Sequence, residues 1–478
     1  MSAQVLWTAA EARAATDGMG PGHWRATGVS IDSRSVAAGD LFAALSGPNH
    51  DGHDFVAAAL RKGAAAALVS RRPEGLADDA PLLLVEDTLE ALRGLAAAAR
   101  KRTAAGVFAI TGSSGKTSSK ELLAGACAAL GSSHAAVASY NNHWGVPLTL
   151  ARMPRDVAWA VCEIGMNHAG EIRPLAQLVR PHAALVTNIG LVHLEHLGSR
   201  EAIADAKAEI FEGLEPGGKA ILPRGDDFFE RLAVAARDRG AEVVSFGAHP
   251  ASDVRLLDYR PEGEGGVVEA LVFERPLTFR VPFAGRHQAF NALGVLAALQ
   301  TLGGDLEQAA KGLAKVEPLA GRGARRHLAL AGGGSITLLD ESYNANPQSV
   351  AAALAVLGEV KPAGAGRRIA VLGDMLELGP EAGRLHAEVM KPLVAAGVSH
   401  AFLCGPLMEQ LAQALPRNVT VVHAADSQAL AEVLMPALGE GDVVLVKGSL
   451  GSRMQRIVDA LKAAGTSEES RGGGARAL

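Results

Sequence analysis

The feature that most restricts the fold of this chain is the alternation of short runs of Val, Ile and Leu with longer alanine-rich stretches. Short β-branched runs are typical of buried strands, and the stretches between them have the length and composition of helices. Strands that alternate with helices form βαβ units with parallel strands. The pattern therefore predicts an α/β protein. It is most regular in the last third of the chain, at 336–340, 367–374, 400–405, 419–425 and 442–449.

The length of 478 residues predicts two to four domains, with three as the central expectation. We expect a small N-terminal α/β domain in 1–102, a central domain in 103–319 and a Rossmann-like, doubly wound domain in 320–464. A basic helix end marks the first boundary, and a segment rich in glycine and arginine marks the second. Residues 465–478 have a glycine run and no apolar periodicity, which predicts a disordered tail.

The composition excludes several classes of protein. With 48% apolar and 20% charged residues, the chain is globular and not disordered. The net charge of -5 argues against a nucleic-acid partner, because phosphate neutralisation needs clustered Lys and Arg. No secretory signal or run of about 18 apolar residues is found, so we expect no membrane insertion. Three widely spaced cysteines fit a reducing compartment, and a cytoplasmic location is predicted.

The strongest local motif is the segment Val107–Ser118, where a buried strand runs into a glycine-containing turn and then a helix. Such a turn binds phosphate through its backbone N–H groups and the helix N-terminus, while a lysine reaches the terminal phosphates and a hydroxyl ligates Mg2+. Ile110 stands where the longer motif has its first glycine, so this loop is a shortened variant, in a central sheet of the P-loop ATPase type. An ordinary strand-to-helix turn with a solvated lysine is the alternative. The residues expected to bind the ATP phosphates are Gly112, Ser113, Ser114, Gly115, Lys116, Thr117 and Ser118.

Two later strand runs also end in residues that bind cations. Glu163 ends one of them, and a loop with His193 and His196 follows the next. Because the carboxyl ends of parallel strands meet at one edge of a sheet, we expect Glu163 and His193 close to the phosphate loop, as candidate Mg2+ ligands. Lys207 lies in the helix that follows, and on its own it would be a solvated helix lysine.

Five motifs in this order resemble the Mur ligase family of peptidoglycan synthesis. They are TGSSGKTS at 111–118, YNNHWGVP at 140–147, EIGMNHAGEI at 163–172, TNIGLVHLEHLGS at 187–199 and AKAEIF at 206–211. The resemblance implies an ATP-dependent ligase that uses two Mg2+ ions. It also implies that Lys207 is carbamylated, which turns a cation into an anionic oxygen ligand. The implied metal ligands are Thr117, Glu163, His193 and Lys207, and the implied catalytic residues are Lys116, His193 and Lys207.

The start of the chain resembles the family's domain for the uridine-diphosphate end of the substrate, in IDSR at 31–34 and DGHDF at 51–55. The resemblance implies that Ser33 and Arg34 contact the diphosphate, for which an Arg side chain is well suited. Asn141 and Asn142 are implied contacts of the muramoyl substrate.

The C-terminal half contains DESYNANP at 340–347 and LGDMLELG at 372–379. These resemble the family members that add D-alanyl-D-alanine to UDP-N-acetylmuramoyl-tripeptide through an acyl phosphate. The implied neighbours of the adenosine are Asn291, Tyr343 and Asn344. Whether the third residue of the tripeptide is diaminopimelate or lysine stays open.

Other functions are weighed against this one. A family member that adds the third peptide residue is the nearest rival, and the N-terminal segments speak against a folylpolyglutamate synthase. A regulatory nucleotide-binding module would keep the phosphate loop without needing Glu163, His193 and Lys207 together. The resemblance implies the muramoyl nucleotide and D-alanyl-D-alanine as partners, and a monomer is the expected state.

Overall fold

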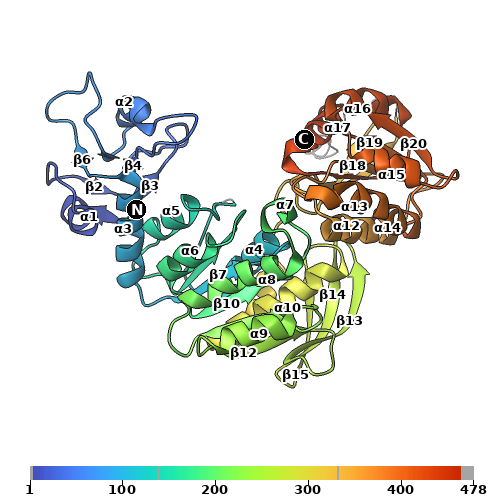
Figure 1. Ribbon diagram of the computed structural model, residues 1–478, viewed down its shortest axis with the longest axis horizontal. Coiled ribbons are helices and arrows are strands. Elements are labelled where there is room, and N and C mark those ends of the chain that lie inside the picture. Colours follow the sequence, from blue (N-terminus) through green and yellow to red (C-terminus); the bar gives the residue numbers. More distant parts are fainter. Residues whose placement is uncertain (1–3, 138, 331–332, 465–478) are drawn as a thin grey trace, which may run out of the picture.

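The structure of the chain is a computed structural model that describes residues 4–137, 139–330 and 333–464. Within these ranges the strands form three larger sheets and a two-stranded ribbon of β1 (Trp7–Thr8) and β2 (Arg25–Ala26). The three sheets lie in a row, with the middle sheet between the two ends of the chain (Figure 1). The predicted α/β class is confirmed. The predicted tail, 465–478, lies outside the described residues, and the domain boundaries stay predictions.

The N-terminal sheet is small and parallel, in the order β3-β4-β5-β6. Helix α2 packs on one face through Val56 and Ala59, whereas α1 and α3 join the larger core that continues into the middle of the chain. These elements are β3 (Gly28–Ser30), β4 (Asp40–Ala43), β5 (Ala66–Val69), β6 (Leu82–Leu84), α1 (Ala9–Thr16), α2 (Val56–Arg61) and α3 (Thr88–Lys101).

The central sheet has the order β15-β14-β13-β12-β11-β10-β7-β9-β8. The six strands β7 to β12 pair in parallel, as predicted. In contrast, β13 pairs with β14, and β14 with β15, in antiparallel fashion, which was not predicted from the sequence. The turn between β14 and β15 is a two-residue hairpin in which Phe273 and Glu274 both have positive φ. The strands are β7 (Gly106–Thr111), β8 (Ser133–Ala135), β9 (Trp159–Glu163), β10 (Ala183–Val186), β11 (Lys219–Pro223), β12 (Glu242–Gly247), β13 (Val254–Glu262), β14 (Gly265–Val272) and β15 (Arg275–Val281).

Helices cover both faces of the central sheet because its strands are apolar on both sides. Along β7, Val107 and Ala109 face one core, and Phe108 and Ile110 face the other. Helices α4, α10 and α11 fill the second core, and the remaining helices fill the first. The helices that cover the two faces are α4 (Lys116–Leu130), α5 (Gly145–Ala151), α6 (Ile172–Val179), α8 (Arg200–Ala208), α9 (Phe229–Arg237), α10 (Arg286–Thr301) and α11 (Leu306–Leu313).

The C-terminal sheet has the order β16-β17-β21-β18-β19-β20, and all five predicted strand runs are present. All neighbouring pairs are parallel except β16 with β17, so β16 is an antiparallel edge strand. Helices on both faces make the domain doubly wound, as predicted. The elements are β16 (Ala324–Ala329), β17 (Ser335–Glu341), β18 (Arg368–Gly373), β19 (His400–Cys404), β20 (Thr420–Ala424), β21 (Val443–Lys447), α12 (Pro347–Glu359), α13 (Ala382–Glu388), α14 (Met390–Ala395), α15 (Met408–Ala414), α16 (Ser427–Leu434) and α17 (Gln455–Ala464).

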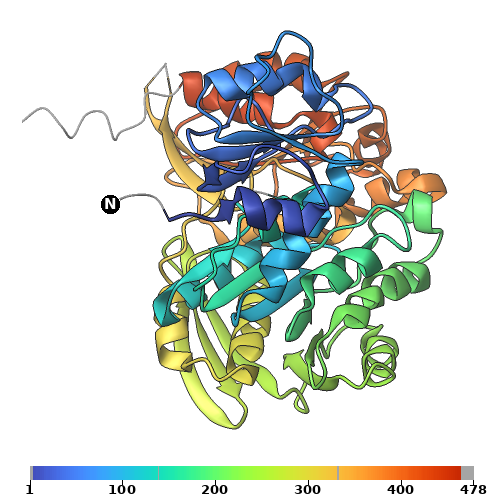
Figure 2. The ribbon, with the colours of Figure 1, turned by 90° about the vertical axis from the view of Figure 1, so that its left-hand side faces the viewer.

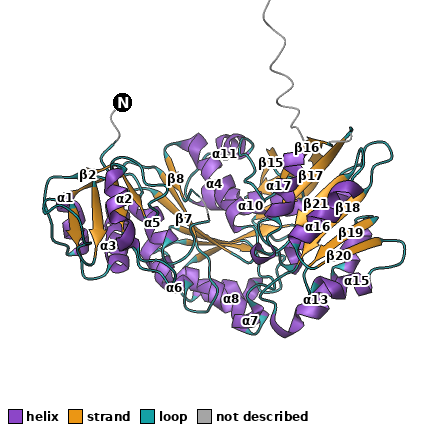
Figure 3. Cartoon of the chain, turned by 90° about the horizontal axis from the view of Figure 1, so that it is seen from above, coloured by secondary structure: helices purple, strands orange, loops and turns teal. Residues whose placement is uncertain are grey.

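The N-terminal sheet is attached to the central part by hydrogen bonds as well as by apolar packing. Arg152 Nε donates to the Val29 carbonyl at 2.5 Å, and Trp7 Nε1 donates to the Ala151 carbonyl at 2.8 Å. Helix α3 packs against α5 at this junction (Figure 2). Across the other junction, the short helix α7 (Leu194–Leu197) lies against the turn at 379–381 of the C-terminal part. The view from above shows the three sheets side by side along the molecule (Figure 3).

None of the described helices has the length and apolar character needed to cross a bilayer.

Candidate active site

A cavity of about 1150 Å3 opens between the central sheet and the C-terminal sheet. The carboxyl ends of β7, β9 and β10 face it from one side, and the loops after β17, β18 and β21 face it from the other. Ligands of open α/β sheets bind at such strand ends. The predicted site residues that line it are Ser113, Ser114, Gly115, Lys116, Thr117, Ser118, Asn141, Asn142, Glu163, His193, Asn291, Tyr343 and Asn344.

The phosphate loop connects β7 to α4, and its two glycines are required by the turn. Gly112 and Gly115 have φ of +148° and +78°, where other residues are strained. A Cβ atom on Gly112 would lie 1.8 Å from Thr187 Oγ1, and one on Gly115 would lie 2.8 Å from Asn291 Oδ1. The backbone therefore passes so close to its neighbours that only glycine fits.

Residues at the end of the neighbouring strand β10 hold the loop in shape. Thr187 Oγ1 donates to the Ser114 carbonyl at 2.6 Å, and Asn188 Nδ2 donates to the same oxygen at 3.1 Å. In return, the N–H groups of Ser113 and Ser114 donate to the carbonyl and the side-chain oxygen of Asn188. The TN pair of the TNIG motif thus fixes the conformation of the phosphate loop.

Lys116 follows this turn as the first residue of α4 and is half-buried. Its Nζ donates to the Gly112 carbonyl at 2.6 Å, so the side chain curls over the loop. Burial lowers the pKa of the Lys116 ammonium; Glu163 opposes this shift, and Arg322 adds to it. A cation held over the N-terminus of a helix is suited to an anionic ligand.

Glu163 ends β9 and is almost fully buried. Its Oε2 accepts a hydrogen bond from Thr117 Oγ1 at 2.9 Å, and its Oε1 accepts one from Asn141 Nδ2 at 2.7 Å. The predicted meeting of Thr117 and Glu163 is therefore present. The contact of Asn141 with Glu163 was not predicted, and Asn142 Oδ1 accepts from the backbone N–H groups of Trp144 and Gly145 at the start of α5.

His193 lies directly before α7 with a left-handed backbone, φ +52°. Its Nδ1 lies 2.5 Å from Oε2 of Glu377, a residue of the C-terminal part. Burial lowers the pKa of His193; Glu377 opposes this shift, and Lys116 and Lys207 add to it. His196 does not line the cavity; its ring lies beside that of His168, with the centroids 4.6 Å apart and the two planes at 37°.

Lys207 lies in α8 and is 2% exposed. It is not the solvated helix lysine that its local sequence suggests. Burial, together with the nearby charge of Lys116, holds the pKa of the Lys207 amine well below its usual range. Within the described ranges no carboxylate lies within 4.0 Å of this amine. Lys207 lies near the cavity but is not among the residues that line it.

The donor chemistry of the site is compatible with Mg2+. The Thr117 hydroxyl and the Glu163 carboxylate are oxygen ligands, which Mg2+ prefers, and this ion usually takes its remaining ligands from water and phosphate. Among the described residues there is no group of three or more His, Cys, Asp or Glu that could hold a metal ion. The residues present fit an ion that is bound together with a nucleotide, not one enclosed by protein alone.

The C-terminal face of the cavity contains residues that the sequence analysis missed. Arg322 was treated as part of a domain boundary, but its guanidinium lies 3.8 Å from the centre of the Tyr343 ring and donates to Ser139 Oγ at 3.0 Å. Lys447 Nζ donates to the Asn344 carbonyl at 3.0 Å and lies 3.5 Å from Glu341. Burial lowers the pKa of Lys447, although Glu341 opposes the shift. For Arg322, the signal available in the sequence was the pair of glycines on either side of it, which indicates a tight turn.

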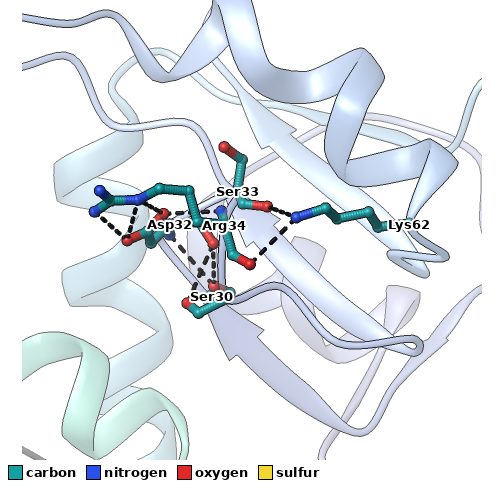
Figure 4. A network of polar contacts seen from close by, with 6 residues as sticks. Ser30, Asp32, Ser33, Arg34 and Lys62 are labelled. Carbon is teal, nitrogen blue, oxygen red and sulfur yellow. Dashed lines mark hydrogen bonds and ion pairs between the residues drawn. The ribbon is translucent and has the colours of Figure 1, made fainter.

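Ser33 and Arg34 do not line the cavity but lie in the loop after β3 (Figure 4). The Arg34 side chain is exposed and forms a bidentate ion pair with Asp32. Hydrogen bonds from Arg34 lower the pKa of Asp32 to about 2. Lys62 Nζ donates to the carbonyls of Ser33 and Arg34 at 2.7 and 3.2 Å, which places a second cation in the loop.

Comparison with known proteins agrees with this geometry. Residues 110–299 match the Mur ligase middle domain, 325–450 match the glutamate ligase domain of the Mur ligases, and 25–100 match the catalytic domain of the Mur ligase family. The chain is 37% identical over 441 residues to the UDP-N-acetylmuramoyl-tripeptide–D-alanyl-D-alanine ligase of Escherichia coli, covering 92% of this chain and 94% of that one.

Two solved structures are also similar. MurF from Acinetobacter baumannii superimposes with a TM-score of 0.83 at 30% identity, covering 95% of this chain and 98% of that one. The MurF ligase from Thermotoga maritima, solved in complex with ADP, gives 0.76 at 26% identity, covering 93% and 98%. With these matches over nearly its whole length, the chain belongs to the Mur ligase family.

Proposed function

We propose that this chain is the ATP-dependent ligase that joins D-alanyl-D-alanine to UDP-N-acetylmuramoyl-tripeptide in the synthesis of peptidoglycan precursors. One observation supports this most strongly: the phosphate loop, Glu163, His193 and the DESYNANP loop all line one cavity between two sheets. The identity to relatives with this activity extends over both sides of that cavity.

The chemistry follows from the problem of joining a carboxylate to an amine. A carboxylate oxygen is a poor leaving group, so the terminal carboxylate of the tripeptide attacks the γ-phosphorus of ATP, the bond to ADP breaks, and an acyl phosphate forms. The amine of D-alanyl-D-alanine then attacks the acyl carbon, loses a proton, and expels inorganic phosphate. Little covalent chemistry falls to the protein, so positioning and charge neutralisation carry catalysis.

The nucleotide is held by the residues of the phosphate loop. The N–H groups of 112–118 and the Lys116 ammonium face the β- and γ-phosphates, while Asn291, Tyr343 and Asn344 border the adenosine. Thr117 and Glu163 would hold one Mg2+, and His193 and Lys207 a second. These ions supply positive charge against the phosphate oxygens. The protein's own part is to present these oxygen and nitrogen ligands at one end of the nucleotide.

Lys207 serves this role as a carbamate. A buried ammonium without a carboxylate partner is costly, and burial accordingly lowers the pKa of Lys207, which favours the neutral amine. The amine nitrogen bonds to the carbon of CO2 and releases a proton, which gives a carbamate anion. The reaction gives the Lys207 side chain a negative charge and two oxygen atoms, which are the ligands that Mg2+ prefers.

The other end of the substrate is assigned to the N-terminal part. Ser33 and Arg34 bind the uridine diphosphate, and Asn141 and Asn142 meet the muramoyl portion nearer the cavity. This substrate and ATP are both found in the cytoplasm, where the protein acts as a monomer. Its three free cysteines, all buried, fit that reducing compartment.

A panel of amine donors tests the proposal. Phosphate release from ATP is measured with muramoyl dipeptide or tripeptide, each with lysine, diaminopimelate or D-alanyl-D-alanine. We expect release only with the tripeptide and D-alanyl-D-alanine together, and a strong loss in Lys116→Ala. Release with dipeptide and a single amino acid identifies a third-residue ligase instead. ATP binding without release under any combination identifies a regulatory module.

A further inference from the structure

One contact across the cavity has no place in the roles assigned so far. Nδ1 of His193 lies 2.5 Å from Oε2 of Glu377. His193 follows strand β10 of the central sheet, whereas Glu377 follows strand β18 of the C-terminal sheet. We propose that Glu377 is a positioning residue that fixes His193 as its Nδ1–H tautomer, so that Nε2 presents a lone pair to Mg2+. The proposal rests on the proposed function only in naming that ion.

The chemistry of the two groups determines the tautomer. A carboxylate can only accept a hydrogen bond, so the ring nitrogen that faces it must carry the proton. A neutral imidazole has a single N–H, and in His193 this N–H is on Nδ1, which faces Glu377 Oε2. Nε2 is therefore unprotonated. In the part of the chain that the structure describes, Nε2 has no hydrogen-bond partner.

A carboxylate in this position is a general feature of histidines that bind metals. Such histidines donate the N–H of the other ring nitrogen to a carboxylate or carbonyl, which fixes the ring and raises its basicity. His193 lines the cavity on the same side as the phosphate loop and Glu163. Glu377 is thus placed to prepare the ligand without itself reaching the reacting atoms.

The loop that carries Glu377 is held on both sides. The backbone N–H of Leu376 donates to Ser449 Oγ at 2.9 Å, and the carbonyl of Glu377 accepts from the Glu195 N–H at 3.2 Å. Glu377 itself has a φ of +62°, a strained conformation that persists where neighbouring contacts hold it. The carboxylate therefore reaches His193 only while the C-terminal part lies against α7. His193 is positioned by the arrangement of the two parts, not by the central part alone.

A spectroscopic test reads the tautomer directly. The protein is labelled with 15N in its histidine rings, and the two-bond 15N–1H spectrum is recorded at pH 8, with the His193 signals identified by their loss in His193→Gln. We expect the wild-type ring to be protonated on Nδ1. In Glu377→Gln the amide can accept or donate, and in Glu377→Ala no partner remains, so both variants should shift toward the Nε2–H form. Their unfolding midpoints are recorded alongside.

Glu195→Gln is the matched control. It removes the same charge two residues from His193, its side chain is exposed, and among the described residues no hydrogen bond or ion pair joins it to the ring. This variant should keep the wild-type tautomer. In the second arm, the Mg2+ concentration for half-maximal phosphate release should rise about tenfold in Glu377→Gln and not in the control.

Three results would overturn the proposal: a wild-type ring protonated on Nε2, an unchanged tautomer in both Glu377 variants, or an equal shift in Glu195→Gln. If the wild-type protein releases no phosphate with its proposed substrates, the proposed function fails, and the ring spectra still decide the role of Glu377.

Discussion

The hydroxyl of Thr117 donates a hydrogen bond to the carboxylate of Glu163 at 2.9 Å, and both side chains are buried. Thr117 lies in the first turn of α4, and Glu163 ends the neighbouring strand β9. This contact joins the phosphate-binding turn to the acid that the sequence places about fifty residues later. The contact holds the two oxygens side by side at the carboxyl end of the central sheet.

The Thr117 hydroxyl is expected to matter for Mg2+ more than for packing. Thr117→Val keeps the shape but leaves Glu163 Oε2 without this donor, whereas Thr117→Ser keeps the hydroxyl and loses a methyl group. We expect Thr117→Val to raise the Mg2+ requirement of phosphate release by about tenfold or more, and Thr117→Ser to leave it near wild type. A Mg2+ titration of both variants measures this. If Thr117→Val and Thr117→Ser have the same Mg2+ dependence, the Thr117 hydroxyl has no part in binding the ion.

Gly115 should tolerate no side chain. Its φ is +78°, and a Cβ atom would lie 2.8 Å from Asn291 Oδ1. Gly115→Ala should cost about 1–2 kcal/mol of unfolding free energy for the backbone alone, and it should weaken ADP binding at least tenfold, which is about 1.4 kcal/mol. Gly217→Ala is the matched control because Gly217 has φ +74° and open space around it.

Urea denaturation and calorimetric titration with ADP separate the two effects. The control should lose similar stability and keep its affinity for ADP. If Gly115→Ala binds ADP as tightly as the control does, the phosphate-loop assignment fails.

Lys207→Ala should lose nearly all ligase activity and regain part of it when acetate or formate is added. A short carboxylate can enter the space left by the side chain and supply the oxygen ligand that the carbamate supplied. Sodium chloride at the same ionic strength is the control for a salt effect. Full activity without any added carboxylate would exclude Lys207 from the mechanism.

The three cysteines should be unreactive in the folded protein. Burial raises the pKa values of Cys127, Cys162 and Cys404 to about 12. At pH 8, below these values, the thiolate that reacts is roughly one part in ten thousand. Labelling with iodoacetamide at pH 8 should therefore be at least about a hundredfold slower than in denaturing urea. Rapid labelling of any of them in the native protein would show that its core position is wrong.

Much of the fold could be predicted because the relevant signals are local. The five strand runs of the C-terminal sheet are apolar on both faces, and the glycine turn before Lys116 is specified by adjacent residues. The antiparallel strands β13 and β14 were missed because buried residues in them alternate with less buried ones, unlike the continuous apolar runs that mark buried parallel strands. In addition, the two turn residues between β14 and β15 are Phe273 and Glu274, not the glycine or asparagine that usually indicates a tight hairpin.

The site was harder to predict where it depends on contacts between distant parts of the chain. Glu163 and His193 could be placed because parallel strand ends share an edge. The contact of His193 with Glu377 spans 184 residues, and that of Arg322 with Ser139 spans 183. No local pattern encodes such pairs. Arg322 follows a glycine with φ +74°, so its backbone turn was visible in the sequence, but the Tyr343 ring beneath it was not.

The most direct test of the central claim follows an oxygen atom. UDP-N-acetylmuramoyl-tripeptide is prepared with 18O in its terminal carboxylate and incubated with the protein, ATP, Mg2+ and D-alanyl-D-alanine, and the released phosphate is analysed by mass spectrometry. An acyl phosphate carries one carboxylate oxygen to the phosphate, so we predict one 18O in each inorganic phosphate and a new peptide bond in the product. Phosphate that contains no 18O would come from hydrolysis by water and would contradict the account.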